Sequence, residues 1–490
     1  MTTYSAVVTT GIYCRPGCGA TPRAENVRTF GLPAAAEAAG FRACYRCRPY
    51  RVAGPVAGDT PELVCQVVQL IIEGALDGGG TEAALADRVG VSARHLRRLF
   101  LAHLGATPDQ LARSRRAHFA RRLLDDTDLA VVDVAFASGF GSLRQFNRAM
   151  REVFRAPPTE LRARRHRADR LVADGGLTLR LPVPSGYDWD AMRTFLAARL
   201  MPGVEAVDGD TYRRTIAVGA APGLLEIGPG DPGSLTLRAH LPYWEGLIHV
   251  VGRAGRLLGL DIDHAAGTTA LRADPVLGPL VARRPGLAVP GAWSPFEAGV
   301  WAIAGRQRDP AAALEALVTG LGSPVPGLPG GLTHLFPDPG AVTSAGLAAA
   351  GLPAAEASAI EALAAAQGDA GVRDYVAFRS GAREAFPVAD AALRAALADL
   401  GLSAAGGTAF TAPWRPWLAL AAAHLMAHGE ELVGVDPAGV EAARHALARR
   451  LRMAGRRQGE GLGGRGVRGA VAGEDPRQTA EVVPARVLPI

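Results

Sequence analysis

Four cysteines within the first 47 residues constrain the start of this chain more than any other feature. They form two close pairs, Cys14 with Cys18 and Cys44 with Cys47. Two such pairs supply four thiolates to one tetrahedral zinc ion, and the metal replaces the apolar core that so short a segment lacks. The alternative, a pair of disulfides, is disfavoured because the chain starts without a signal-peptide pattern and has only one other cysteine, Cys65. We therefore expect Zn²⁺ as the cofactor, bound by the four paired cysteines.

The sequence around these cysteines narrows the role of the metal. Residues 9–16, 25–27 and 39–47 resemble the amino-terminal zinc domain of Ada-type DNA-repair proteins. The resemblance implies that the first cysteine, Cys14, accepts a methyl group from a methylated DNA phosphate. A purely structural zinc has the same cysteine spacing and stays open as an alternative. The chain departs from the family at Tyr45, where a lysine is usual.

Length and composition indicate several domains and a polyanionic partner. The chain has 490 residues, more than one hydrophobic core usually serves. All 53 basic residues are arginine and the net charge is +6, and the planar guanidinium suits phosphates and guanine edges. No apolar run of about 20 residues suggests a membrane span. We expect a cytoplasmic protein associated with the nucleoid.

A helical segment with an internal repeat follows the zinc motif. Thr81 is expected to cap a helix that ends near Gly90, and Ser92 starts a second helix after the turn. The pattern returns in residues 131–138 and 142–148. Two such units resemble the AraC-type DNA-binding domain, which implies that both second helices enter successive segments of the major groove.

Each second helix has an apolar and a polar face. The apolar residues, expected to face the core, are Leu96, Leu99, Phe100, Phe146, Met150 and Val153. The polar residues predicted to reach bases or phosphates are Ser92, Arg94, His95, Arg97, Ser142, Arg144, Gln145 and Arg148. The alternative for each arginine is a solvated side chain without DNA contact. Cys65 lies in an apolar helical context and is expected to be a small buried hydrophobe.

The pattern then changes to alternating apolar residues, which predicts antiparallel strands. The predicted strands are residues 177–183, 212–218, 224–227 and 235–241. Residues 187–189, 195–199 and 202–205 resemble the amino-terminal domain of AlkA-type 3-methyladenine DNA glycosylases. Residues 284–303 continue that likeness into the helical catalytic domain of the family.

The AlkA-type resemblance assigns roles to three residues of this chain. It implies that Asp390 stabilises positive charge on the sugar while the glycosidic bond breaks, and that Phe195 and Tyr375 line the pocket for a flipped-out base. A carboxylate suits a transition state that resembles an oxocarbenium ion. The alternative for Asp390 is a helix N-terminal carboxylate that interacts with the helix dipole. Without lysine the chain forms no lysine Schiff base, so we expect a monofunctional glycosylase.

One departure from the family weighs against activity. Residues 362–374 are too short to hold most of the helix-hairpin-helix whose backbone N–H groups bind a DNA phosphate in this family. Met426 stands where a second pocket tryptophan is expected. Two interpretations stay open. One is an active glycosylase of the DNA-3-methyladenine glycosylase II type, and the other is a DNA-binding transcription regulator with a catalytically inactive glycosylase domain.

The predicted fold class is therefore multidomain, mainly α with α+β parts. The predicted parts are a zinc domain (1–50), a linker (51–62), a double helix-turn-helix domain (63–166), an AlkA-type amino-terminal α+β domain (176–288), a shortened all-α glycosylase domain (289–430) and a disordered tail (431–490). We expect it to sense methyl phosphotriesters, regulate transcription and excise 3-methyladenine and 7-methylguanine. The expected partners are double-stranded DNA and RNA polymerase.

Overall fold

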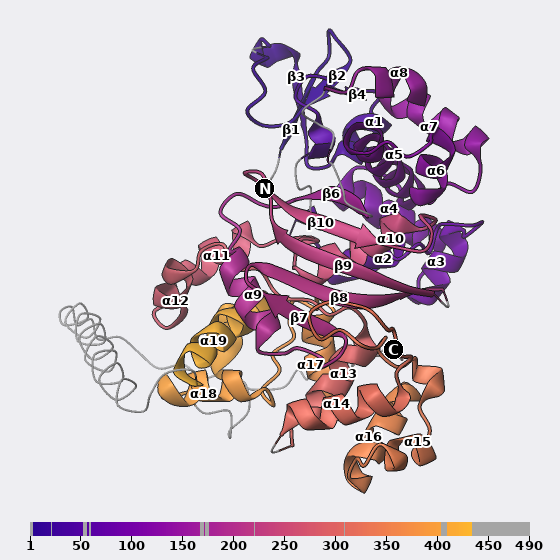
Figure 1. Ribbon diagram of the computed structural model, residues 1–490. Coiled ribbons are helices and arrows are strands. Elements are labelled where there is room, and N and C mark those ends of the chain that lie inside the picture. Colours follow the sequence, from indigo (N-terminus) through magenta and orange to yellow (C-terminus); the bar gives the residue numbers. More distant parts are fainter. Residues whose placement is uncertain are drawn as a thin grey trace, which may run out of the picture.

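A computed structural model describes residues 3–20, 22–51, 56–57, 60–166, 171, 176–219, 221–307, 309–402 and 409–433. Figure 1 shows four parts, with a small sheet at the top, a helical bundle beside and below it, a larger sheet in the middle and a second group of helices at the bottom. The multidomain fold class is confirmed. From residue 434 onward, the expected tail lies outside the described residues.

The first part is a four-stranded sheet in the order β3-β1-β2-β4. Its elements are β1 (Tyr4–Val7), β2 (Ile12–Cys14), β3 (Val27–Phe30), α1 (Pro33–Ala38) and β4 (Arg42–Ala43). Strand β1 pairs antiparallel with β2 and β3, whereas β2 and β4 run parallel. The core between the sheet and α1 is small and includes Tyr4, Tyr13 and Ala36, each at most 1% exposed. So small a core agrees with a domain that depends on a metal.

The second part is the helical bundle with its two predicted helix-turn-helix units. Its helices are α2 (Glu62–Ile72), α3 (Glu82–Arg88), α4 (Ala93–Leu104), α5 (Pro108–Asp126), α6 (Val131–Ala137), α7 (Leu143–Phe154) and α8 (Pro158–Ala163). The hydroxyls of Thr81, Ser92 and Ser142 accept hydrogen bonds from backbone N–H groups at the starts of α3, α4 and α7. The two predicted turns between helices are therefore confirmed, because the capping residues start the helices where the sequence placed them.

The zinc-motif sheet packs directly on this bundle. Glu37 accepts a hydrogen bond from the Tyr13 hydroxyl at 2.7 Å and pairs with His118 of α5 at 2.6 Å. The Tyr45 hydroxyl donates to the backbone oxygen of Phe154, the last residue of α7. The Glu37 contacts join the sheet and α1 to α5, and the Tyr45 contact joins the metal-binding loop to the second helix-turn-helix unit.

The third part is a five-stranded antiparallel sheet in the order β6-β10-β9-β8-β7. Its elements are β6 (Leu177–Pro182), α9 (Trp189–Ala197), β7 (Glu205–Asp208), β8 (Thr211–Val218), β9 (Ala221–Pro229), β10 (Ser234–His240), α10 (Leu247–Leu257), β11 (Ile262–Asp263), α11 (Ala265–Arg272) and α12 (Leu277–Arg283). The four predicted strands are confirmed. The edge strand β7 was not predicted, because its sequence Glu-Ala-Val-Asp has no apolar alternation and only pairing with β8 orders it.

A glycine contact positions α9 against the segment that precedes the last group of helices. A Cβ atom on Gly286 would lie 1.6 Å from the backbone oxygen of Gly186, so no other residue fits there. The backbone N–H of Asp188 donates to the Gly286 oxygen at 3.0 Å, and the Asp188 carboxylate caps α9. This close approach fixes the direction of the helix that carries Phe195.

Polar contacts join the helical bundle to the third part. Gln69 of α2 donates to Asp261 at 2.6 Å, and Glu73 accepts from Arg256 of α10 at 2.6 Å. Within the expected linker, β5 (Val56–Ala57) pairs in parallel with β11. The expected linker therefore contributes to the contact between the helical bundle and the third part. Helix α2 begins at Glu62, the last residue of that expected linker.

The fourth part is helical, as predicted. Its helices are α13 (Pro295–Ala304), α14 (Pro310–Leu321), α15 (Ser344–Ala349), α16 (Ala354–Ala364), α17 (Ala370–Arg379), α18 (Ala391–Asp399) and α19 (Leu418–Val433). Helix α19 packs along α18 and α12 and continues three residues past the expected domain end at 430. Among the described residues, no helix is long and apolar enough to cross a membrane.

Candidate functional site

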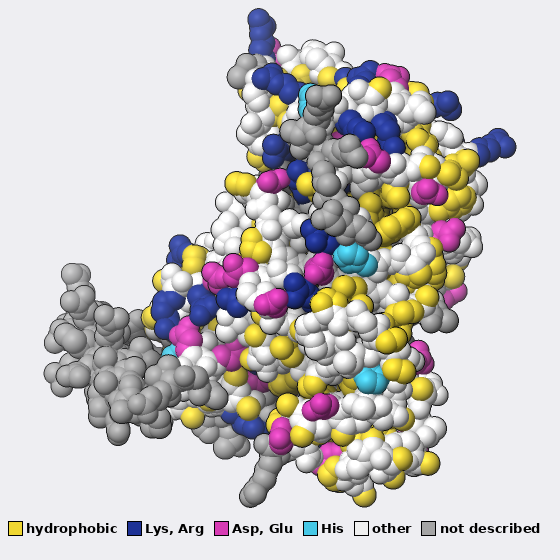
Figure 2. Space-filling model, viewed as in Figure 1, with side chains coloured by type: hydrophobic (Ala, Val, Ile, Leu, Met, Phe, Trp, Pro, Cys, Tyr) yellow, Lys and Arg dark blue, Asp and Glu magenta, His cyan; other side chains and the backbone are white. Residues whose placement is uncertain are grey.

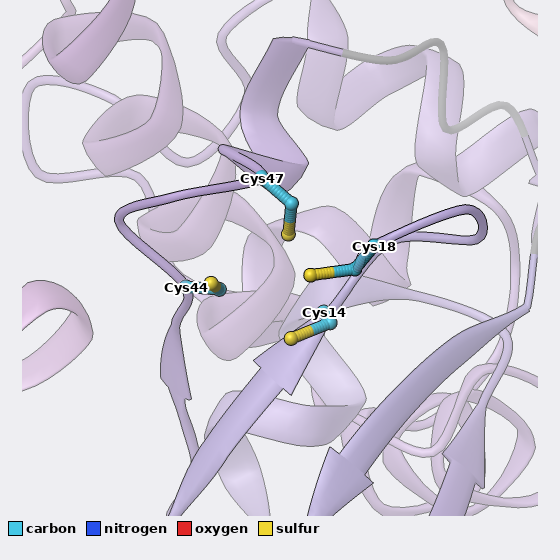
Figure 3. A group of neighbouring side chains, drawn as sticks. All are labelled: Cys14, Cys18, Cys44 and Cys47. Atoms are coloured by element: carbon cyan, nitrogen blue, oxygen red, sulfur yellow. The ribbon is translucent and has the colours of Figure 1, made fainter. Parts of the chain in front are cut away.

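The four cysteines of the metal motif converge. Figure 3 shows their side chains pointing toward one another, and all four sulfur atoms lie within 4.8 Å of one another. Strand β2 ends at Cys14, and its parallel partner β4 is followed at once by Cys44. The Cys44 N–H donates to the Tyr13 oxygen at 3.0 Å, which continues the pairing into the metal-binding loop. The sheet thus brings together two cysteine pairs that are distant in sequence.

The chemistry of these donors fits a zinc ion. Cys14 is 6% and Cys47 9% exposed, while Cys18 and Cys44 are half-buried. The hydrogen bond between the two thiols lowers the pKa of Cys47 and raises the pKa of Cys14 well above its usual value, so without a metal the shared proton stays on Cys14. Four soft sulfur donors around one point form a typical tetrahedral zinc site. One face of the cluster remains accessible through the half-buried pair.

The first helix-turn-helix unit uses some of its polar residues for its own structure. The Ser92 hydroxyl accepts from the His95 N–H at 3.2 Å and caps α4. Arg97 forms an ion pair with Glu82 of α3 at 2.6 Å, which ties the two helices together. Arg94 is exposed and is free to face a ligand. This geometry favours Arg94 over Arg97 as a contact to DNA.

The second unit presents a more basic face. Arg144, Gln145 and Arg148 are exposed on α7, and Ser142 caps the helix through the Gln145 N–H at 3.2 Å. A shallow hollow along α7 is lined by Arg144, Asn147, Arg148, Arg151, Glu152 and Arg155. Figure 2 shows one side of the whole molecule, with arginines over its upper part. Figure 1, in the same view, places the metal-motif sheet, α7 and α8 there.

The opposite faces of both second helices are in the core, as predicted. Leu96, Phe100, Phe146 and Met150 are fully buried and Val153 is 4% exposed, whereas Leu99 is partly buried. Cys65 is 8% exposed among apolar neighbours, which confirms the prediction of a small buried hydrophobe.

The residues expected around a base pocket lie together between the third and fourth parts. Two guanidinium groups lie over the Phe195 ring, with Arg199 Cζ at 3.8 Å and Arg379 Cζ at 5.0 Å from its centroid. Arg379 also donates to the Tyr375 hydroxyl at 2.9 Å. The Tyr375 ring stacks on Trp301, with centroids 5.3 Å apart and an interplanar angle of 19°. The result is an aromatic cage that already holds cations.

Asp390 lies beside this cage and is almost completely enclosed, since its side chain is 1% exposed. One carboxylate oxygen accepts from the Leu393 N–H at 3.0 Å and caps α18. The other lies 3.4 Å from Arg199 Nη2. One oxygen of Asp390 therefore caps the helix, as the alternative interpretation expects, while the other oxygen faces Arg199 in the cage.

Comparisons with known sequences agree with this architecture. Three family models match the chain: the metal binding domain of Ada at residues 2–50, a helix-turn-helix domain at 85–164 and the AlkA N-terminal domain at 178–294. A Mycobacterium tuberculosis protein named probable bifunctional transcriptional activator/DNA repair enzyme AlkA is 36% identical over 455 residues, which cover 86% of this chain and 91% of that protein. The chain belongs to this family of bifunctional AlkA proteins.

Two Escherichia coli proteins each match 24% of this AlkA-family chain. The bifunctional transcriptional activator/DNA repair enzyme Ada is 39% identical over 121 residues, which cover 24% of this chain and 32% of that protein. DNA-3-methyladenine glycosylase 2 is 38% identical over 124 residues, which cover 24% of this chain and 41% of that protein. Together with the cysteine cluster, the match to the Ada metal binding domain establishes Zn²⁺ as the cofactor.

A short turn joins α16 and α17 in this AlkA-family chain, in the segment that the sequence predicts to lack most of a hairpin. Helix α16 ends at Ala364 and α17 begins at Ala370, and the Asp369 carboxylate between them caps α17 through the Val372 N–H at 2.9 Å. Arg306 donates to both Asp369 oxygens, at 2.6 and 2.8 Å, and lowers the pKa of that carboxyl to about 2. The N-terminus of α17 is therefore occupied by a carboxylate of the chain itself.

Sequence reasoning missed four residues that shape the cage, namely Arg199, Trp301, Arg379 and Glu430. Arg199 follows Phe195 by four residues, a spacing that places both on one side of a helix and was the available signal. Trp301 lies within the segment 284–303 that carries the AlkA-type likeness, but that likeness assigned it no role. Met426, at the position expected for a pocket tryptophan, is fully buried in the core.

Proposed function

We propose that this chain repairs alkylated DNA and activates transcription in response to DNA methylation. The observation that carries the proposal is the order of its parts. A cysteine cluster, two helix-turn-helix units and an AlkA-type sheet domain follow one another in one chain, and the alignment with a bifunctional AlkA protein covers 91% of that relative. Double-stranded DNA is the partner of all three parts. RNA polymerase is the proposed partner of the activator, and the proposed location is the cytoplasm, at the nucleoid.

In the proposed sensing step, Cys14 accepts a methyl group once, without turnover. The Cys14 sulfur attacks the methyl carbon of a phosphotriester, an S–C bond forms, and the phosphate oxygen leaves with the electron pair of the broken O–C bond. Zn²⁺ held by the four cysteines would keep that sulfur ionised at neutral pH and still leave it a soft nucleophile. The half-buried Cys18 and Cys44 show that solvent reaches one side of the cluster. The competing structural role of zinc predicts no methyl transfer.

In the proposed repair step, Asp390 acts on a base that has left the duplex. The bond between C1′ and the base nitrogen breaks, the base takes the electron pair, and water adds to the cationic sugar. The carboxylate stabilises that cation electrostatically, while an alkylated base that already carries positive charge leaves as a neutral molecule. The proposed activity is monofunctional and of the DNA-3-methyladenine glycosylase II type, with 3-methyladenine and 7-methylguanine as released bases.

The competing function is a transcription regulator with an inactive glycosylase domain. The observation that favours it is the short turn before α17, where Asp369 and Arg306 occupy the helix terminus with an internal ion pair. A helix N-terminus filled by its own carboxylate offers less to a DNA phosphate. We therefore expect slow base release even with the Asp390 chemistry intact.

Base release from methylated duplex DNA discriminates between the two functions. Asp390→Asn removes the charge but keeps the α18 cap, because asparagine is also a good N-cap residue. We expect wild type to release methylated bases slowly without strand cleavage, and Asp390→Asn to release them at least about 100-fold more slowly. The matched control is Asp309→Asn, since Asp309 caps α14 at an exposed position. Equal background release by wild type and Asp390→Asn would establish the regulator function instead.

A further inference from the structure

The aromatic cage beside Asp390 is filled by the guanidinium of Arg199. Its Cζ lies 3.8 Å from the Phe195 centroid and 5.4 Å from the Trp301 centroid, and its side chain is 5% exposed. Aromatic rings attract a cation that lies over their face, because the ring quadrupole is negative there. Arg199 therefore occupies the space of a cationic guest.

The charges around this guanidinium balance. Two carboxylates face it, since Glu430 of α19 forms an ion pair with Nη1 and Asp390 lies 3.4 Å from Nη2. A second cation, Arg379, is held by the Gly291 oxygen and the Tyr375 hydroxyl. Burial alone would lower the pKa of Arg199, but the neighbouring negative groups, Glu430 foremost and Asp390 among them, together outweigh it and the pKa is raised. The enclosed site thus holds two positive and two negative groups.

A base cannot approach Asp390 while Arg199 stays in place, because Phe195, Tyr375 and Asp390 are each at most 6% exposed. Arg199 has to withdraw before a base enters. Its withdrawal leaves Asp390 and Glu430 with only one nearby cation, and a buried charge without a partner is strongly unfavourable. A cationic base restores the balance, whereas a neutral base does not.

We propose that Arg199 determines specificity by exchange, so that a base enters the cage only when its own positive charge replaces that of the arginine. This inference rests on the proposed glycosylase function and deepens it. It implies that the site takes bases alkylated at a ring nitrogen, which are cationic in DNA, and rejects neutral damaged bases. Arg199 is a specificity residue here and takes no part in the bond cleavage.

The first test compares a cationic and a neutral base in one duplex sequence. We measure single-turnover release of 7-methylguanine and of hypoxanthine by wild type, Arg199→Ala and Arg199→Lys. The ratio of the two rates should fall at least about tenfold in Arg199→Ala, because no resident cation then has to be replaced. It should stay near the wild-type ratio in Arg199→Lys, which keeps a cation. An unchanged ratio in Arg199→Ala would overturn the proposal.

The matched control for this test is Arg193→Ala. Arg193 lies on α9, and its guanidinium pairs with the exposed Asp190 at 3.8 Å, whereas Arg199 pairs with Asp390 and Glu430. Its removal should leave the ratio of the two rates unchanged.

The second test needs no base release. N-methylpyridinium and toluene have almost the same shape and differ in charge. The cation should raise the thermal unfolding midpoint of full-length Arg199→Ala, toluene should not, and neither should affect wild type. Equal effects of the two probes, or no effect of the cation, would contradict a cation-selective cage. Where Arg199→Ala is too unstable, Arg199→Ala combined with Glu430→Gln removes one unpaired carboxylate and serves in its place.

The two proposals fail in distinguishable ways. If wild type and Asp390→Asn release both bases at the same background rate, the glycosylase function fails, and the pyridinium experiment still decides whether the cage selects cations. If wild type releases both bases with a ratio that Arg199→Ala leaves unchanged, the glycosylase function stands and the exchange proposal fails.

Discussion

At the scale of single residues, the metal site is the most sharply testable feature. Changing Cys44 to Ser removes one soft donor from a cluster whose sulfurs lie within 4.8 Å of one another. Binding energy in such a site is also folding energy, so this change should abolish stoichiometric zinc and unfold the amino-terminal sheet. Cys65→Ser is the control, because Cys65 lies in a separate apolar cluster. Metal analysis of wild type should give one zinc per chain, and a zinc-free wild type would exclude the metal site.

Single residues also show where sequence reasoning reached its limit. The four cysteines were predictable because their spacing alone defines a zinc motif. Asp390 came from resemblance, and its helix-capping role follows from its place before an apolar helical run. For Arg199 the four-residue spacing from Phe195 was a local signal, but its pairing with Glu430, 231 positions further along the chain, was not predictable. Arg199 lies just after the end of α9 at Ala197, and only the tertiary fold brings it to Glu430 of α19, which no local pattern reports.

At the scale of elements, the two second helices of the helix-turn-helix units divide their arginines between structure and surface. Arg144 of α7 is exposed, so Arg144→Ala should weaken binding to the operator by about 1–3 kcal/mol if it reads a base edge. Arg97→Ala should instead reduce stability, because it leaves the 7%-exposed Glu82 carboxylate without its ion-pair partner. With Arg97 57% exposed, that loss should be about 0.5–1 kcal/mol. Gel-shift titrations measure operator binding and urea unfolding measures stability. If Arg144→Ala lowered only stability and Arg97→Ala weakened only operator binding, the two roles would be exchanged.

The elements themselves were predictable to an unequal degree. Capped helices and strands with alternating apolar residues were found because Thr81, Ser92 and Ser142 mark helix starts and the sheet has one buried face. Strand β7 escaped prediction, since it is a short, half-exposed edge strand with acidic ends. The shortness of residues 362–374 already predicted the loss of most of the hairpin. The sequence did not predict that Asp369 and Arg306 would form an ion pair at the N-terminus of α17.

At the scale of the whole molecule, the zinc motif touches the second helix-turn-helix unit through Tyr45. This residue lies between Cys44 and Cys47, its hydroxyl bonds to the end of α7, and its ring lies between Arg42 and Arg164 at 4.5 and 4.6 Å.

Four thiolates around Zn²⁺ carry two net negative charges, and methylation of one sulfur removes one of them. Repulsion from DNA phosphates should then decrease, and operator affinity should rise at least about threefold at low salt. Equal affinities of methylated and unmethylated protein at one salt concentration would exclude this switch.

We propose that one chain carries out two different reactions on methylated DNA. The most direct measurement is mass spectrometry of one reaction mixture that contains the full-length protein and methylated duplex DNA. We predict that the peptide with Cys14 becomes heavier by one methyl group, and that free 7-methylguanine or 3-methyladenine appears above the level of DNA incubated alone. An unmodified Cys14, or free bases only at the level of the DNA-only sample, would contradict the claim.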